Sequence, residues 1–189
     1  MTAFQIHTAE TAPEAKPQLD QALKSNGFVA NLFGAMAESP ALLEGYRKLS
    51  AIFDTTDLTP TERQVVLMVN NRLNGCGYCM AAHTAISKKT GVPSDVIEAL
   101  RSGAPIADPK LEALRVFAVR VNESRGWPDP SELDALIAAG YTKRTVLEVV
   151  LGTALKVMSN YTNHVAATPV DPAFASMAWS PEELVESTK

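Results

Sequence analysis

The sequence predicts an all-α protein, and three observations support this fold class. Ser or Thr followed by proline, a common start of a helix, recurs at Ser39-Pro40 and Thr59-Pro60. Apolar residues recur every three or four positions, which is the period of one face of an α-helix. No set of segments alternates between apolar and polar residues as half-buried strands do. We therefore expect one helical domain over 1–189, a bundle of roughly eight to nine helices.

The N-terminal quarter is expected to form two helices. Residues 14–25 form the first, and a glycine-containing stretch, 26–34, follows it. Ser39 is suited to be an N-cap with Pro40 at the first helical position, so the next helix should run from there toward Asp54.

A central helix is expected after Thr59. Pro60 again stands at the first helical position, and Glu62 can complete a capping box with Thr59. The run Val65–Val69 is apolar on every side of a helix. A helix of this kind is usually buried, so we expect it to lie at the centre of the fold.

The rest of the chain continues the pattern after a break at Asn74-Gly75. A helix should begin near Cys76 and end at Gly91, a residue type common just beyond a helix. Further helices are expected over 93–103, 108–124, 131–139 and 142–166.

Two apolar surfaces point to self-association. One is the Val65–Val69 run, and the other is a stripe on the last helix made of Val146, Val149, Val150, Thr153, Val157 and Tyr161. Together they give more apolar surface than one small domain easily covers. We therefore predict a homo-oligomer.

A weak internal echo places Arg63 to His83 in register with Arg144 to His164. Two halves built on one plan would explain it, and so would chance similarity between two apolar helices. Both explanations stay open at this stage.

Composition restricts the classes of partner. The chain has 46% hydrophobic and 20% charged residues and a formal net charge of -4, so no basic surplus exists to neutralise nucleic acid or an anionic membrane. The N-terminal segment 1–20 lacks the apolar run of a signal peptide. We expect a cytoplasmic protein with no nucleic-acid or membrane partner.

The chemistry is expected at Cys76, Cys79 and His83, which share one face of a helix at positions i, i+3 and i+7. The N-terminal end of a helix favours a thiolate, and an imidazole one turn later can take a thiol proton. A nucleophile, a resolving thiol and a base would result. Cys76 is closer to the helix start and expected to be more exposed, whereas Cys79 is closer to His83.

The cysteine pair has three other possible interpretations. The two cysteines could be ordinary core residues. They could bind zinc, although only His7 and His164 remain as further histidines and no second cysteine pair exists. They could belong to a thioredoxin-like fold, in which the pair follows a strand and Thr168-Pro169 would face it.

The pattern Leu58-Thr-Pro-Thr-Glu-Arg-Gln64, followed by Asn74-Gly-Cys76-Gly-Tyr-Cys79-Met-Ala-Ala-His83, resembles the alkylhydroperoxidase D-like (AhpD-like) group of the carboxymuconolactone decarboxylase superfamily. The specific match covers about residues 57–100. Looser similarity at Gly27–Phe33 and Asn160–His164 extends it to the longer, peroxidase-related members. The resemblance implies an AhpD-like helical bundle, homo-oligomers, and reduction of hydroperoxides or disulfides without a metal or organic cofactor.

The resemblance also implies roles for residues. Cys79 would attack the peroxide and Cys76 would resolve the intermediate. The family usually has a glutamate at the position of Gln64, where it relays protons with the histidine; Gln64 can orient His83 but supplies no charge, so we expect slow peroxidase turnover. Glu62 is the nearest carboxylate, although capping explains it better. Tyr78 and His164 are taken as substrate-binding candidates.

The functional prediction is therefore a cysteine-based antioxidant oxidoreductase that reduces a small hydroperoxide or disulfide and is restored by a thiol reductant. One alternative is a decarboxylase or lactone-processing enzyme like the family's namesake, which would have no use for two thiols. The other is a non-enzymatic helical module that senses oxidants or binds zinc.

Overall fold

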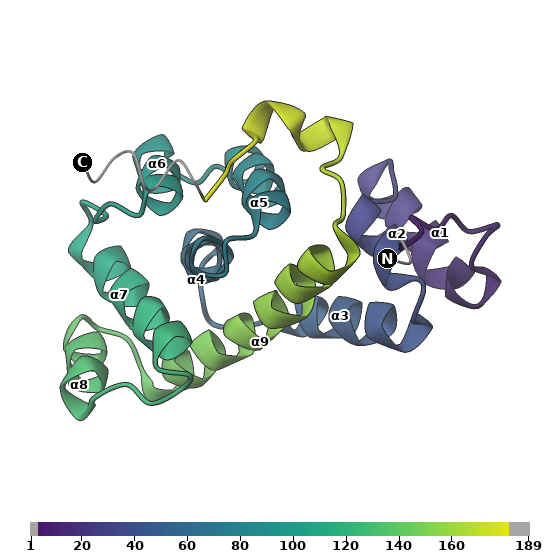
Figure 1. Cartoon of the computed structure of the whole chain (residues 1–189). Coiled ribbons are helices and arrows are strands. Elements are labelled where there is room, and N and C mark those ends of the chain that lie inside the picture. The colour runs from purple at the N-terminus through teal and green to yellow at the C-terminus, as the bar shows by residue number, and fades with distance from the viewer. Residues whose placement is uncertain (1–3, 182–189) are drawn as a thin grey trace.

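The computed structural model describes residues 4–181, which form nine α-helices and two short 3₁₀ helices and contain no strand (Figure 1). The all-α prediction is confirmed. In chain order the elements are η1 (Pro13–Ala15), α1 (Lys16–Asn26), α2 (Asn31–Met36), α3 (Pro40–Phe53), α4 (Pro60–Leu73), α5 (Gly77–Lys89), α6 (Ser94–Ser102), α7 (Pro109–Glu123), α8 (Pro130–Ala138), α9 (Lys143–Ala166) and η2 (Pro172–Met177).

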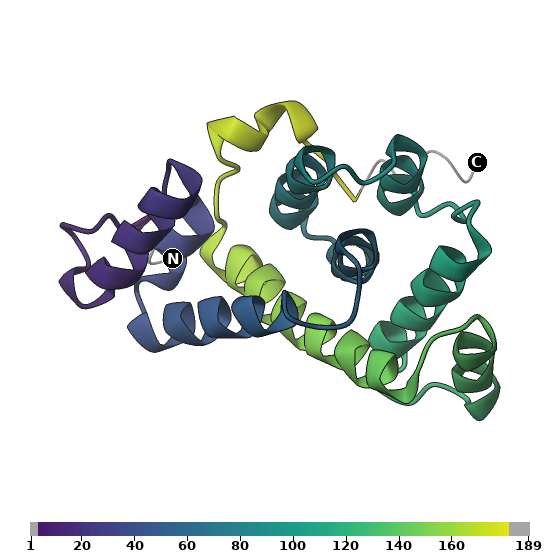
Figure 2. The same ribbon diagram turned by 180° about the vertical axis from the view of Figure 1, so that it is seen from behind.

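Helix α4 lies at the centre of the fold, as its all-round apolar run predicts. In Figures 1 and 2 it is seen nearly end-on, with α5, α6, α7 and α9 around it, and each of these four helices packs against it. The expected capping box starts this helix, because Thr59 Oγ1 accepts from the Glu62 amide and Glu62 accepts from the Thr59 amide. Val65, Val66 and Met68 are fully buried.

Two short elements were not predicted. Helix α2 occupies part of the stretch that was expected to be irregular, and η2 follows the last helix. Neither is long enough to show a helical period. The two segments of the internal echo differ in structure. Arg63 to His83 spans two helices, α4 and α5, with a break at Asn74 to Cys76, whereas Arg144 to His164 lies in one continuous helix, α9.

Helix α9 turns a mainly polar face inward, and its apolar stripe lies largely outside the core. The buried residues of this helix are mostly polar or small: Thr145, Glu148, Val149, Gly152, Leu155, Lys156, Ser159, Asn160 and Asn163. From the predicted apolar stripe only Val149 is buried, and Val150 and Tyr161 are exposed. Most of the stripe is therefore not core, and the side of α9 that faces α4 and α5 is the polar one.

Close packing lets α9 reach this position. A Cβ atom on Gly152 would lie 2.7 Å from Val66 Cγ1 and 2.9 Å from Phe53 Cε2, both closer than real Cβ contacts. Glycine therefore allows α9 to cross α3 and α4 at short range, and the polar groups that follow it along α9 are carried to the end of α4.

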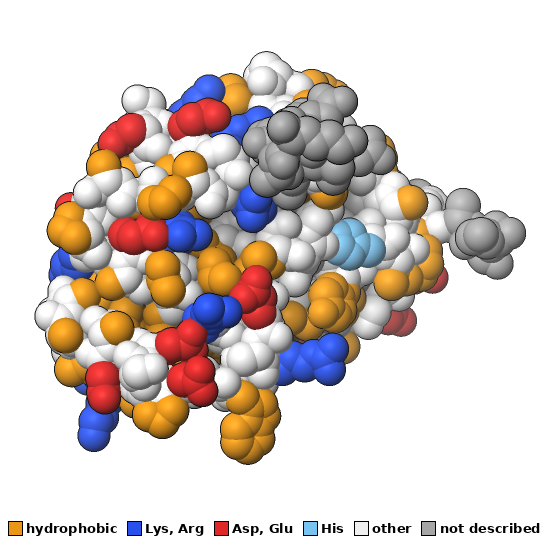
Figure 3. All heavy atoms as spheres, turned by 60° about the vertical axis from the view of Figure 1, so that its left-hand side comes forward, with side chains coloured by type: hydrophobic (Ala, Val, Ile, Leu, Met, Phe, Trp, Pro, Cys, Tyr) orange, Lys and Arg blue, Asp and Glu red, His pale blue; other side chains and the backbone are white. Residues whose placement is uncertain are grey.

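One face of the molecule can be followed in Figure 3. Acidic, basic and hydrophobic side chains are interspersed over the face shown in Figure 3. Among residues 4–181, no helix combines the length and the apolar character that crossing a membrane requires.

The Gly152 contact predicts a stability difference. Gly152→Ala should lower the free energy of unfolding by roughly 1–3 kcal/mol, because the new methyl group overpacks the crossing. The matched control is Gly45→Ala in the exposed interior of α3, where a Cβ atom meets only Met158 Cε at 3.7 Å. That change should leave the stability equal or raise it by about 0.5–1 kcal/mol through helix propensity. Urea unfolding measures both, and a Gly152→Ala protein as stable as wild type would contradict the packing argument.

Candidate active site

The cysteine pair lies at the junction between α4 and α5. Asn74 ends α4, and Gly75 adopts φ 66°, a left-handed conformation that few other residue types tolerate. The turn makes Cys76 the N-cap of α5, and its amide donates to Asn71 O at 2.9 Å. Cys79 therefore lies in the first turn of α5, with His83 one turn further on.

The segment after η2 covers this turn. A Cβ atom on Gly77 would lie 2.7 Å from Trp179 O, so the backbones approach closely at the start of α5. Trp179 is anchored there because its Nε1 donates to Arg101 O of α6 at 3.1 Å. The close contact explains the glycine between the cysteines and shields Cys76 from solvent.

Both thiols are buried and free, with Cys76 1% and Cys79 2% exposed. The expectation that Cys76 is the more exposed thiol was wrong, because the C-terminal segment packs on its side of the helix. Of the two, Cys79 lines the cavity described below and Cys76 does not. A molecule in the cavity therefore meets Cys79 first.

His83 lies between two polar partners. Its Nδ1 is 2.9 Å from Gln64 Oε1, and its Nε2 is 3.0 Å from Lys156 Nζ. An ammonium can only donate, so Nε2 accepts and the proton of the neutral ring is on Nδ1, which donates to Gln64. Burial and the neighbouring Lys156 charge both hold the pKa of His83 well below its usual range. His83 is thus a neutral imidazole.

Cys79 has the surroundings of a thiolate. Asn163 Nδ2 donates to Cys79 Sγ at 3.2 Å and lies 3.8 Å from Cys76 Sγ. The pKa of Cys79 is lowered, first by a hydrogen bond from Cys76 and then by the Lys156 charge and by hydrogen bonds from Ser159 and Asn160; together these outweigh the effect of burial, which raises it. The pKa of Cys76 is raised in turn, because it shares this hydrogen bond and is also buried. The pair consists of one thiolate and one thiol.

The polar face of α9 was missed in the sequence. Lys156, Asn160 and Asn163 are spaced i, i+4 and i+7, so this face has a helical period of its own. In a sequence, a polar stripe on a long helix indicates a side that faces solvent. The structure shows that this stripe is buried, because it lies opposite the cysteines.

A chain of side-chain amides holds the motif in place. Asn160 Nδ2 donates to Asn71 Oδ1 at 3.0 Å, and Asn71 Nδ2 donates to Cys79 O at 3.2 Å. Asn74 Nδ2 donates to Asn160 Oδ1 at 2.9 Å, and Asn122 Nδ2 of α7 donates to Asn74 Oδ1 at 3.2 Å. Because buried amides must be paired, this network fixes α4, α5, α7 and α9 around the cysteines.

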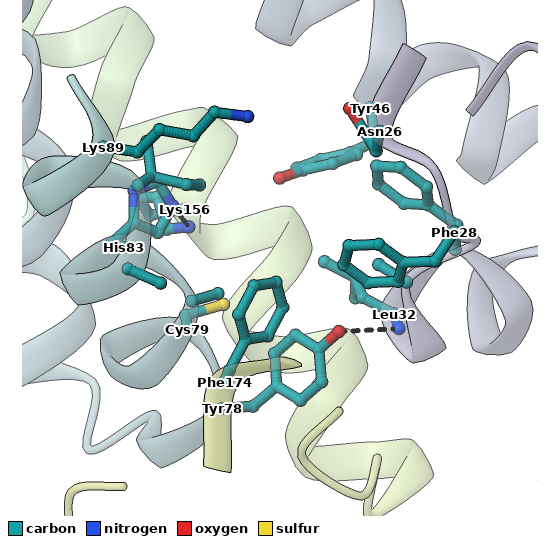
Figure 4. Close-up of a pocket in the computed structure, with 15 residues that line it drawn as sticks. Asn26, Phe28, Leu32, Tyr46, Tyr78, Cys79, His83, Lys89, Lys156 and Phe174 are labelled. Atoms are coloured by element: carbon teal, nitrogen blue, oxygen red, sulfur yellow. Dashed lines mark hydrogen bonds between the residues drawn. The ribbon is translucent and has the colours of Figure 1, made fainter. Parts of the chain in front are cut away.

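A cavity of about 290 Å³ opens above Cys79 (Figure 4). Its walls are mainly apolar and carry the rings of Phe28, Phe33, Tyr46, Tyr78 and Phe174. The Cys79 sulfur lies between the His83–Lys156 pair on one side and Tyr78 and Phe174 on the other. The cavity therefore suits a small apolar molecule that presents its reactive atom to Cys79.

Tyr78 is part of the cavity wall and is fixed at its hydroxyl group. The hydroxyl donates to Asp171 Oδ2 at 2.5 Å and accepts from the Leu32 amide at 3.1 Å. Asp171 also accepts from the Asn31 amide at 3.0 Å. Tyr78 thus connects the motif to α2 and to the start of η2, and Leu32, Phe33 and Phe174 of these two elements line the cavity.

The other two candidates do not reach the cysteines. Glu62 Oε1 accepts from Tyr141 Oη at 2.9 Å and lies 3.6 Å from Lys110 Nζ, so the carboxylate is used in capping and packing at the start of α4. His164 is exposed and stacks on Tyr161, and it is not among the residues that line the cavity. Among residues 4–181, no group of three or more His, Cys, Asp or Glu side chains is arranged to hold a metal ion.

Comparisons with known proteins agree with this architecture. Residues 37–119 match the carboxymuconolactone decarboxylase family. No match was found among curated proteins.

Three solved structures share the fold. The debrominase Bmp8, as a variant in complex with 2,3,4-tribromopyrrole, is 18% identical with a TM-score of 0.75, and the match covers 100% of this chain and 98% of that one. An uncharacterized peroxidase-related protein from Ralstonia eutropha JMP134, an alkylhydroperoxidase AhpD core, is 22% identical (TM-score 0.74, 92% and 96% covered). A peroxidase-related protein from Silicibacter sp. TM1040 is 18% identical (TM-score 0.74, 86% and 87% covered).

The thiolate assignment predicts a titration. Because the pKa of Cys79 is lowered, its thiolate should be present at neutral pH and should disappear only as the pH falls through that lowered value, well under the ordinary thiol pKa of about 8.5. Cys76→Ala removes the donated hydrogen bond and should raise the pKa of Cys79, whereas Cys76→Ser keeps a donor and should raise it less. The ultraviolet absorbance of the thiolate against pH measures this, with Cys79→Ala as the blank. A wild-type titration at the ordinary thiol value would contradict the assignment.

Proposed function

We propose that the chain, which matches the carboxymuconolactone decarboxylase family over residues 37–119, is a thiol-dependent oxidoreductase of the AhpD-like group that reduces hydroperoxides through Cys79 and Cys76. The observation that carries the proposal is that Cys79 lines an apolar cavity with Cys76 next to it, in surroundings that lower the pKa of Cys79 and raise the pKa of Cys76. A nucleophile that faces the substrate and a resolving thiol behind it are what two-step peroxide reduction requires.

The steps balance without a cofactor. The Cys79 thiolate attacks the terminal oxygen of the hydroperoxide, the O–O bond breaks, and the alkoxide leaves as an alcohol after taking up a proton. Cys79 is now a sulfenic acid. Cys76 then attacks its sulfur, a disulfide forms, and the Cys76 proton and the sulfenic hydroxyl leave as water. A thiol reductant restores both cysteines. Such a cycle fits the reducing cytoplasm, which is where we place the protein.

A second candidate, reductive dehalogenation of a small aromatic compound, is favoured by the five aromatic rings of the cavity and by the structural likeness to a debrominase. Two thiols would be oxidised to the disulfide, a carbon–hydrogen bond would replace the carbon–halogen bond, and a halide ion and a proton would be released. Decarboxylation, the activity of the family's namesake, would leave both thiols unused.

Cysteine variants test the proposal. Addition of one equivalent of cumene hydroperoxide to the reduced protein should lower its mass by two hydrogens and remove both free thiols. Cys79→Ser should not react. Cys76→Ser should stop at a sulfenic acid on Cys79, which a dimedone adduct identifies, because no resolving thiol is left.

The outcomes separate the candidates. A Cys76→Ser protein that is inert while Cys79→Ser reacts would reverse the roles of the two thiols. A wild-type protein that ignores hydroperoxides but releases bromide from 2,3,4-tribromopyrrole, with loss of two thiols, would establish the second candidate instead.

We further propose a homo-oligomer, as the sequence suggests. The outer side of α9 exposes Leu147 (69%), Val150 (48%), Tyr161 (54%) and Val165 (71%). Light scattering at micromolar concentration should give a mass above that of the monomer. Leu147→Glu combined with Val150→Glu should lower that mass, because two buried carboxylates oppose association. A monomeric wild-type protein would refute the proposal.

A further inference from the structure

Lys156 is a buried cation without a carboxylate partner. Its side chain lies on the inner face of α9, is 1% exposed, and lines the cavity beside Cys79. Within residues 4–181, no Asp or Glu oxygen lies within ion-pair distance of its Nζ, which contacts His83 Nε2 instead. An unpaired buried ammonium is costly, and the counter-charge that the cavity offers is a thiolate on Cys79, whose pKa the Lys156 charge lowers.

His83 cannot deliver a proton into the cavity. Its single ring proton is on Nδ1 and is donated to Gln64. Ser87 Oγ also lies 3.4 Å from the same Gln64 oxygen, which supports that orientation of the amide. The other nitrogen, Nε2, presents a lone pair to Lys156. The proton on the cavity side of this pair therefore belongs to the lysine.

Tyr46 is another protic side chain that lines the cavity with Cys79. Its hydroxyl is hydrogen-bonded with Ser159, and burial together with the Cys79 charge raises the pKa of Tyr46. Loss of its proton would leave a buried tyrosinate. Loss of a proton from Lys156 would leave a neutral amine, which a buried site holds at much lower cost.

We propose that Lys156 is the general acid of the reaction and protonates the leaving oxygen of the hydroperoxide. This role rests on the proposed peroxide chemistry. As the Cys79 sulfur forms its bond to the terminal oxygen and the O–O bond breaks, the alkoxide takes a proton from the Lys156 ammonium and leaves as an alcohol. Cys79 becomes a neutral sulfenic acid, and Lys156 becomes a neutral amine hydrogen-bonded to His83.

Charge balance supports this assignment. Before the step the buried site holds one anion and one cation, and after it the site holds neither. If the proton came from water, the ammonium would be left buried with no counter-charge through the disulfide stage. When a reductant restores the Cys79 thiolate, the Lys156 amine takes up a proton again. The thiolate and the ammonium are therefore present at the same stages of the cycle.

The test compares two substrates of similar size that differ in the leaving group. Cumene hydroperoxide releases an alkoxide, which needs a proton, whereas perbenzoic acid releases benzoate, which does not. Single-turnover loss of free thiols is followed for both in the reduced protein. Lys156→Met should lower the rate with cumene hydroperoxide by roughly 10²-fold more than the rate with perbenzoic acid, the usual size of a general-acid contribution.

The ratio of the two rates is measured on one sample. It is therefore independent of the folded fraction and of the fraction of Cys79 that is ionised. Lys156→Gln provides a second variant in case Lys156→Met packs poorly. Lys143→Met, an exposed lysine on the same helix, should change neither rate. Tyr46→Phe should leave the ratio unchanged.

Each outcome decides the assignment. A drop in rate that is selective for cumene hydroperoxide in both Lys156 variants supports Lys156 as the general acid. An equal drop in the rates with both substrates would overturn the assignment, and Lys156 would then only stabilise the thiolate. If only Tyr46→Phe lowers the rate with cumene hydroperoxide selectively, Tyr46 is the general acid instead. A wild-type protein that reacts with neither substrate would overturn the peroxidase proposal and this role together.

Discussion

The Lys156 ammonium lies almost out of reach of water, and a charge in such a place must find its counter-charge and its hydrogen bonds inside the protein. The neighbouring groups satisfy both needs. His83 offers a lone pair, which it can do only as a neutral ring with its proton turned to Gln64. Cys79 offers the negative charge. One buried cation thereby fixes the tautomer of the histidine and the ionisation of the thiol.

The packing of the helices follows from bringing this lysine to the cysteines. Helix α9 must cross the core with its polar side inward, and the small Gly152 permits the crossing. The buried amides of Asn71 and Asn160 join the end of α4 to α9 and hold the first turn of α5. The closing contact comes from Trp179, whose carbonyl packs on Gly77. Elements far apart in the chain thus meet around the first turn of α5, which carries Cys79.

Local signals were sufficient to predict most of the helices and the cysteine motif. Caps and prolines mark where helices begin, and an all-round apolar run marks α4 as central, because these effects act within a few residues. The burial of Cys76 and the role of Lys156 could not be predicted in this way. Both depend on segments that return from far along the chain, and a lysine on a polar helical stripe has the same local pattern whether it faces water or a thiolate.

Gln64 and Lys156 together offer a different solution to the problem that a glutamate–histidine relay solves in the resembling family. A relay with a carboxylate stores its proton on the histidine, next to a negative charge. Here the amide of Gln64 is neutral, so a protonated His83 beside Lys156 would put two cations into one buried site. Burial and this repulsion both lower the pKa of His83. The proton is instead held on α9, on the opposite side of the ring. A glutamine at position 64 is therefore compatible with acid catalysis, because Lys156 holds the proton that a glutamate-paired histidine would otherwise hold.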